Sequence, residues 1–224
     1  DVKEEQCGGV TLHVIPGAEF EDLKAEVEAM ARPAVSSPSV AGVGLDAVAV
    51  AKGFEAVAVG QPLLACEDDL PRTAAALLRH LPAGRDPREA VLLMGHGSSH
   101  GGDAWYERLS AVLHRYDPGV FIATMGGART IDRVLPGLLA FAPERVWLVP
   151  FLAVAGEHVA RDMDGDTPDS WRSQLTRLGL SSVSVLKGAA EYEGLAELWL
   201  DHLRRAVASL RGERTRPGHA TTRG

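Results

Sequence analysis

The sequence predicts an α/β protein built on parallel β-sheets that are flanked by helices. Over residues 90–210, short apolar segments alternate with longer amphipathic ones, which indicates successive βαβ units. The apolar segments are nearly continuous, as in Val146–Val149, and such strands are typical of a parallel sheet covered on both faces. A chain of 224 residues with 46% hydrophobic content is long enough for one large core or two small ones.

The first half of the chain predicts few elements. A β-branched segment over 9–15 predicts a strand, and residues 19–31, with acidic side chains in the first turns, predict a helix. Residues 32–53 are rich in proline, serine and glycine and predict a loop. A second strand is expected over 56–60 and a helix over 68–81. Two strands are too few for a stable doubly wound sheet, so we expect this domain to be incomplete.

The second half alternates strictly between strands and helices. The expected strands cover 90–95, 119–124, 145–152 and 182–187, and the expected helices cover 103–115, 130–141, 157–163, 168–178 and 191–210.

The connection 82–88 has the composition of a domain boundary, with proline, glycine and alternating charges. We therefore expect an N-terminal domain over 1–88, a C-terminal domain over 89–211 and a disordered tail over 212–224. The chain begins at Asp1, without methionine, which favours a processed or truncated product.

Composition argues against several functional classes. The formal net charge is −7, so neither nucleic acid nor an anionic membrane is expected as a partner. The only cysteines, Cys7 and Cys66, lack the spacing of a zinc ribbon, and they give no sign of a disulfide framework. The sequence contains neither a membrane-spanning apolar run nor a recognisable signal peptide. A cytoplasmic location is expected, with the periplasm as the alternative.

Two histidines follow predicted strands and are the strongest functional signals. The segment 91–95 ends on His96, which stands between two glycines. The strand that begins near residue 145 is followed by a glycine and then by His158, at the start of a predicted helix. If these strands are neighbours in a parallel sheet, both imidazoles lie over its carboxyl edge and suit a divalent transition metal. The alternative is structural: His96 is a hydrogen-bonded strand-end residue, and His158 caps or packs a helix.

Three segments together resemble the anaerobic-type cobalt chelatases, the sirohydrochlorin cobaltochelatases of the class II chelatase superfamily. They are Leu-Met-Gly-His-Gly-Ser-Ser-His at 93–100, the run 151–166 with Ser-Trp at 170–171, and Leu-His-Val-Ile-Pro-Gly-Ala-Glu-Phe at 12–20. The resemblance covers residues 8–205. It implies two flavodoxin-like domains that face each other across a cleft and hold a tetrapyrrole between them. It also implies insertion of Co(II) into sirohydrochlorin, without ATP or an organic cofactor, on the path to cobalamin.

The resemblance also implies which residues hold the metal. In the family these are the histidine of Met-Gly-His-Gly, a glutamate after the next strand, and the histidine of Ala-Gly-x-His. The two histidines correspond to His96 and His158, but Gly126 stands where the glutamate is expected. Water or Glu157 could fill that coordination position, and otherwise we expect weaker metal binding. The opening strand and helix of the family have no counterpart here, so the first domain is expected to be truncated.

We expect His96 to act as metal ligand and proton acceptor, since imidazole titrates near neutrality, and His158 to be the second ligand. Three further residues, His13, Glu19 and His100, are candidates for lining the tetrapyrrole site. Glu19 has an alternative as a first-turn helix carboxylate. The nearby acidic cluster Asp162, Asp164 and Asp166 lacks an EF-hand loop, and these residues are expected to cap helices and form turns.

Several alternatives stay open from the sequence. Ni(II) or Fe(II) could replace Co(II), because imidazole binds all three. The loss of the expected glutamate and of the opening segment favours an impaired or non-catalytic protein that carries a tetrapyrrole or a metal, or a gene fragment. The expected partner is a tetrapyrrole, and an uncovered sheet edge would favour a homo-oligomer.

Overall fold

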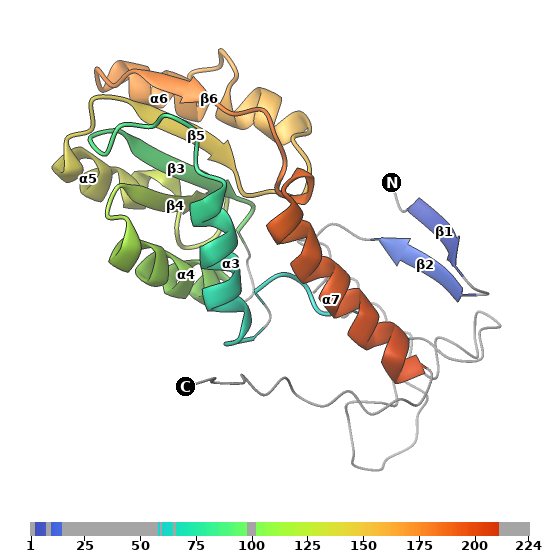
Figure 1. Cartoon of the computed structure of the whole chain (residues 1–224). Helices are drawn as coiled ribbons and strands as arrows, with labels where there is room; N and C mark the ends of the chain where they lie inside the picture. Colours follow the sequence, from blue (N-terminus) through green and yellow to red (C-terminus); the bar gives the residue numbers. More distant parts are fainter. Residues whose placement is uncertain are drawn as a thin grey trace, which may run out of the picture. The chain divides into compact units, whose positions relative to one another are not determined.

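The computed structural model describes residues 3–7, 10–14, 58, 60–64, 66–97 and 102–210 (Figure 1). Contacts between Cα atoms divide the chain into two compact units. One contains Asp1–Ala18 and Leu63–Leu198, and the other contains Glu19–Pro62 and Trp199–Gly224. The expected boundary near residue 88 stays a prediction. Within the described residues, no helix combines the length and apolar character needed to cross a bilayer.

A four-stranded parallel sheet forms the centre of the first unit (Figure 1). Its strands are β3 (Ala90–Gly95), β4 (Val120–Thr124), β5 (Val146–Pro150) and β6 (Ser182–Ser184), in the spatial order β4-β3-β5-β6. Every residue of β3 and β4 is buried, which explains why their sequences are continuous apolar runs. The α/β fold with a parallel sheet, predicted from the alternation of elements, is confirmed.

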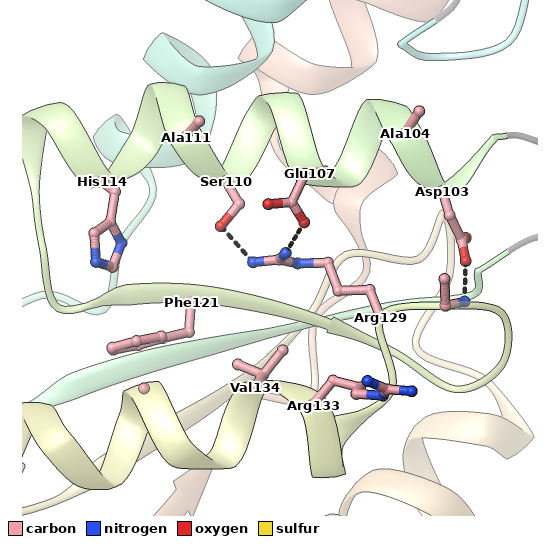
Figure 2. Close-up of a pocket in the computed structure, with 12 residues that line it drawn as sticks. Asp103, Ala104, Glu107, Ser110, Ala111, His114, Phe121, Arg129, Arg133 and Val134 are labelled. Atoms are coloured by element: carbon pink, nitrogen blue, oxygen red, sulfur yellow. Dashed lines mark hydrogen bonds and ion pairs between the residues drawn. The ribbon is translucent and has the colours of Figure 1, made fainter.

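Helices cover both faces of this sheet. On one face, alternate residues of β3 (Ala90, Leu92 and Met94) belong to a core that includes Leu138 of α5 (Ile131–Phe141) and Leu175 of α6 (Trp171–Arg177). α4 (Asp103–Tyr116) packs against α3 (Asp69–Arg79). Figure 2 shows α4 and α5 on opposite sides of β4. The remaining helical elements are the π-helix η2 (Val159–Met163), the 3-10 helix η3 (Ala189–Glu191) and α7 (Glu193–Leu210).

The predicted bounds agree closely with the structure for 90–95, 103–115 and 130–141. The strand expected over 145–152 ends at Pro150, and the strand expected over 182–187 ends at Ser184. The short edge strand is only partly buried, so an apolar run could not mark its end.

The sequence did not predict β1 (Lys3–Cys7), a polar segment that pairs antiparallel with β2 (Val10–Val14). The strand predicted over 9–15 corresponds to β2. The helix expected over 19–31 and the tail expected over 212–224 lie outside the described residues. Of the strand expected over 56–60, only residues 58 and 60 are described, and neither is in a strand.

Side chains cover the outer edge of β4. The Arg129 guanidinium donates from Nε to the Ile122 carbonyl at 2.8 Å and from a terminal nitrogen to Ser110 Oγ at 2.7 Å, and it forms an ion pair with Glu107 (Figure 2). A ring nitrogen of His114, Nδ1, lies 3.2 Å from the Val120 carbonyl. These contacts satisfy carbonyl groups that an uncovered edge strand would offer to another chain.

Arg129→Ala is expected to lower the free energy of unfolding by about 1–3 kcal/mol, because a partly buried carbonyl and hydroxyl lose their donor. Urea unfolding followed by circular dichroism measures this change. Arg133 is an exposed residue of α5, so Arg133→Ala should change the free energy by less than about 0.5 kcal/mol. Equal effects of the two substitutions would show that Arg129 does not protect the edge.

Candidate metal site

The sheet order creates a ligand position between β3 and β5. The chain leaves β3 to form β4 on one side, and then returns to form β5 on the other side of β3. Ligands of open α/β sheets bind outside the carboxyl ends of the strands at such a topological switch point. His96 follows β3 directly, and His158 follows the loop 151–157 after β5.

The two histidine rings lie next to each other. Their centroids are 5.6 Å apart and the planes are nearly perpendicular, at 87°. Two imidazoles that share a metal at about 2.1 Å from each nitrogen have centroids roughly 5 Å apart. Both residues are exposed, so an ion could reach them without a rearrangement of the core. The two imidazoles are therefore near the spacing that shared coordination requires.

Hydrogen bonds indicate which ring nitrogen of each histidine is available. Nδ1 of His158 lies 2.7 Å from Oδ2 of Asp162. Nδ1 of His96 lies 3.3 Å from the Gly97 carbonyl. Carboxylate and carbonyl oxygens accept, so each contact requires a proton on Nδ1, and in the neutral ring Nε2 then keeps its lone pair. Two hydrogen bonds lower the pKa of the Asp162 carboxyl. The larger effect comes from the Arg161 guanidinium and the smaller one from the His158 ring.

The loops after β3 and β4 run side by side. Met125 N–H donates to the Gly95 carbonyl at 3.0 Å, and Gly126 N–H donates to the His96 carbonyl at 3.2 Å. At Gly97, φ is +86° and a Cβ atom would lie 2.2 Å from the Gly126 carbonyl oxygen, so only glycine fits. A Cβ at Gly126 would meet nothing within 4 Å. Position 126 therefore adjoins His96 and has room for a side chain.

Tyr106 of α4 packs against the backbone that leads into the His96 loop. Its ring leaves no space for a Cβ at Gly95, which would lie 2.6 Å from Cε1. Its hydroxyl hydrogen-bonds with the backbone of Gly97 and His96. Burial raises the pKa of the Tyr106 hydroxyl, and these hydrogen bonds offset part of the shift. Sequence analysis missed this residue, because nothing in the helical pattern distinguishes it from an ordinary packing residue.

Tyr106→Phe is expected to cost about 1 kcal/mol of unfolding free energy, because the ring remains while the backbone groups of the His96 loop lose their partner. Thermal or urea unfolding measures the cost. Tyr116 is 73% exposed, so Tyr116→Phe provides a matched control that should be nearly neutral. A neutral Tyr106→Phe would mean that the hydroxyl does not hold the loop.

Backbone hydrogen bonds fix the loop that leads to His158. The N–H groups of Ala189 and Ala190, in η3, donate to the carbonyls of Leu152 and Ala153 at 2.7 and 3.0 Å. Gly188 packs so closely that a Cβ there would lie 2.6 Å from the Ala153 carbonyl oxygen. η3 thereby fixes the first residues of the segment that carries the second histidine.

Of the candidate tetrapyrrole-lining residues, only His13 lies within the part of the chain that the structure describes. His13 lies on β2, where its backbone is in register with Glu4. Glu19 and His100 lie outside the described residues. Glu157 is exposed, and its carboxylate pairs with Arg161 at 3.0 Å. Within the described ranges, no group of three or more His, Cys, Asp or Glu side chains could hold a metal ion.

A separate groove of about 700 Å³ runs between α4 and α5 over the edge of β4 (Figure 2). Neither His96 nor His158 lines it. We therefore place the candidate metal site at the carboxyl edge of the sheet and not in this groove.

The fold is a parallel α/β sheet that carries two adjacent imidazoles at its switch point. This pair of imidazoles is a candidate binding site for a divalent transition metal. Comparison with known proteins gives the family. Residues 9–208 match the family model described as cobalt chelatase (CbiK), so the chain belongs to the CbiK cobalt chelatase family.

Curated relatives carry related names. The chain is 50% identical over 200 residues to the sirohydrochlorin cobaltochelatase CbiKC of Nitratidesulfovibrio vulgaris, covering 89% of this chain and 64% of the relative. It is 28% identical over 200 residues to a sirohydrochlorin cobaltochelatase of Salmonella typhimurium, covering 88% of this chain and 67% of that protein. The chain therefore spans about two thirds of the length of these curated relatives.

Among solved structures, a Deinococcus radiodurans protein is described as a multi-domain protein with structural similarity to chelatases. It matches with a TM-score of 0.44 and 21% identity, over 59% of this chain and 29% of its own.

Proposed function

We propose that this protein inserts Co(II) into sirohydrochlorin without ATP. The observation that carries the proposal is the pair of imidazoles, His96 and His158, with ring centroids 5.6 Å apart at the switch point of the sheet. The names of the two curated relatives support the same substrate and metal. Imidazole is a suitable ligand for Co(II), which is a substrate of the reaction and is released within the product.

In the proposed reaction, Co(II) enters the ring while two pyrrole N–H protons leave. The metal must be held loosely and a proton acceptor must lie on the same face of the ring. His96 serves as ligand and, once it has released the metal, accepts one of the two protons on the freed nitrogen lone pair, while the second proton passes to water. His158 serves as the second ligand and keeps the ion in place until the ring nitrogens bind it.

Within the described residues, no carboxylate joins the two imidazoles to form a three-ligand group. Gly126 offers open space there, which water would fill as the next ligand. A site of two neutral imidazoles holds Co(II) weakly, which favours release into the ring but lowers occupancy at low metal concentration. The proposal places the tetrapyrrole in a cleft between the predicted domains 1–88 and 89–211, with His13, Glu19 and His100 as candidate lining residues.

A second candidate is a protein that carries a tetrapyrrole or a metal without efficient insertion. Gly126 favours this alternative, because it leaves the metal with fewer protein ligands. Within the enzyme class, Ni(II) or Fe(II) are the competing substrate metals.

An anaerobic absorbance assay of the purified chain with sirohydrochlorin and Co(II) tests the proposal. We expect conversion of the spectrum to that of the cobalt complex, faster than in a mixture without protein. Parallel reactions with Ni(II) and Fe(II) rank the three metals. A rate equal to the uncatalysed one for all three metals, together with binding of the tetrapyrrole, would favour the carrier.

A further inference from the structure

Asp162 forms a short side-chain hydrogen bond with His158. The contact joins Oδ2 of Asp162 to Nδ1 of His158 at 2.7 Å, between residues four apart on one helical turn. The two side chains are 32% and 48% exposed, so neither belongs to the core. Core packing therefore does not account for the pairing of these two residues.

A second set of contacts holds the carboxylate in place. Nε of Arg161 donates to Oδ1 of Asp162 at 2.8 Å, and a terminal nitrogen donates to Oδ2 at 3.1 Å. The same guanidinium donates to Oε1 of Glu157 at 3.0 Å. Both carboxylate oxygens of Asp162 are thus engaged, and the one that faces His158 cannot rotate away without losing a charge-assisted hydrogen bond.

The neighbouring acidic residues have other partners. Asp164 accepts from Ser184 Oγ at 2.6 Å and lies 3.5 Å from Nε of Arg172. Asp166 forms an ion pair with Arg172. The expectation that the acidic cluster serves turns and caps therefore does not describe Asp162, which contacts the histidine instead.

The local backbone provides the placement. His158 immediately precedes the π-helix η2, in which Asp164 N–H donates to the Val159 carbonyl at 2.9 Å. Single π turns are rare and occur frequently at functional sites. Asp162 lies within this turn, four residues after His158, and the contact between the two side chains has the spacing of neighbours on one helix face.

We propose that Asp162 is a positioning residue that acts through His158, fixing the ring orientation and the tautomer in which Nε2 faces the incoming Co(II). This role rests on the proposed function. Carboxylates that accept from the second ring nitrogen of a histidine orient it and make it a better metal ligand. Among the described residues, the only hydrogen-bond partner of the His96 ring is the Gly97 carbonyl at 3.3 Å, so the two histidines are held unequally.

The test measures binding of Co(II) alone, under anaerobic conditions, from the visible absorption bands of the ion. We expect Asp162→Ala to weaken Co(II) binding by about 10–100-fold and to change the band shape. Asp162→Asn should lose less, because its amide oxygen can still accept from Nδ1. Asp166 is 99% exposed and forms an ion pair with Arg172, away from the two histidines, so Asp166→Ala should bind Co(II) as the wild type does.

A matching thermal unfolding curve for each variant separates positioning from misfolding. Wild-type affinity in Asp162→Ala would overturn the inference, as would equal losses in Asp162→Ala and Asp166→Ala or the absence of Co(II) binding by the wild type. Failure of the proposed function gives a different result. Co(II) binding would then still depend on Asp162, but the wild type would not accelerate insertion of Co(II) into sirohydrochlorin.

Discussion

His96→Ala is expected to slow Co(II) insertion by more than about 100-fold. Loss of a residue that only supports a ligand typically costs 10–100-fold, and loss of a ligand that also accepts a proton should cost more. The comparison is between initial rates of the anaerobic absorbance change at fixed protein and sirohydrochlorin. His158→Ala should lower occupancy by Co(II), so part of its defect should recover at high metal concentration.

The matched control is His114→Ala. His114 is also exposed, but it lines the groove on the edge of β4 and its ring contacts the Val120 carbonyl. Its loss should leave the rate of insertion nearly unchanged. If His96→Ala retained the wild-type rate, or if His114→Ala were equally defective, the two-histidine site would be wrong.

Gly126→Glu is expected to strengthen Co(II) binding by about 10–100-fold, by analogy with losses at supporting residues. The new carboxylate would project from a backbone that hydrogen-bonds with the His96 carbonyl at 3.2 Å. The added Cβ meets nothing within 4 Å, and the backbone at this position does not need glycine. A carboxylate there would supply an anionic oxygen ligand beside the first imidazole. Titration with Co(II) and the rate of insertion at limiting metal both measure the gain.

Gly126→Gln separates charge from bulk at the same position. The amide has the shape of the carboxylate without its charge, so it should strengthen binding less. Equal gains from Glu and Gln would indicate ordering of the loop and not coordination. No gain from Glu would show that position 126 does not face the metal.

The sequence was sufficient for the elements that carry the site, because their signals are local. Strand β3 was predicted with its observed bounds, since six buried residues end at a glycine and a histidine. The structure pairs β3 with β5, which the sequence left as a condition, and this pairing brings together two histidines that are 62 positions apart in sequence, from His96 to His158.

Other contacts depend on tertiary placement and could not be predicted. Tyr106 contacts the His96 loop only because α4 packs next to that loop. In the sequence, its position cannot be told from that of any other buried helix residue. The polar strand β1 was missed because its sequence has no alternation of apolar residues. Pairing with β2 stabilises the strand instead.

A Co(II) soak of crystals, with anomalous diffraction measured at the cobalt edge, tests the central claim most directly. We expect one strong peak about 2.1 Å from Nε2 of both His96 and His158, with water on the side of Gly126. A peak that touches neither imidazole, or that lies in the groove between α4 and α5, would contradict it.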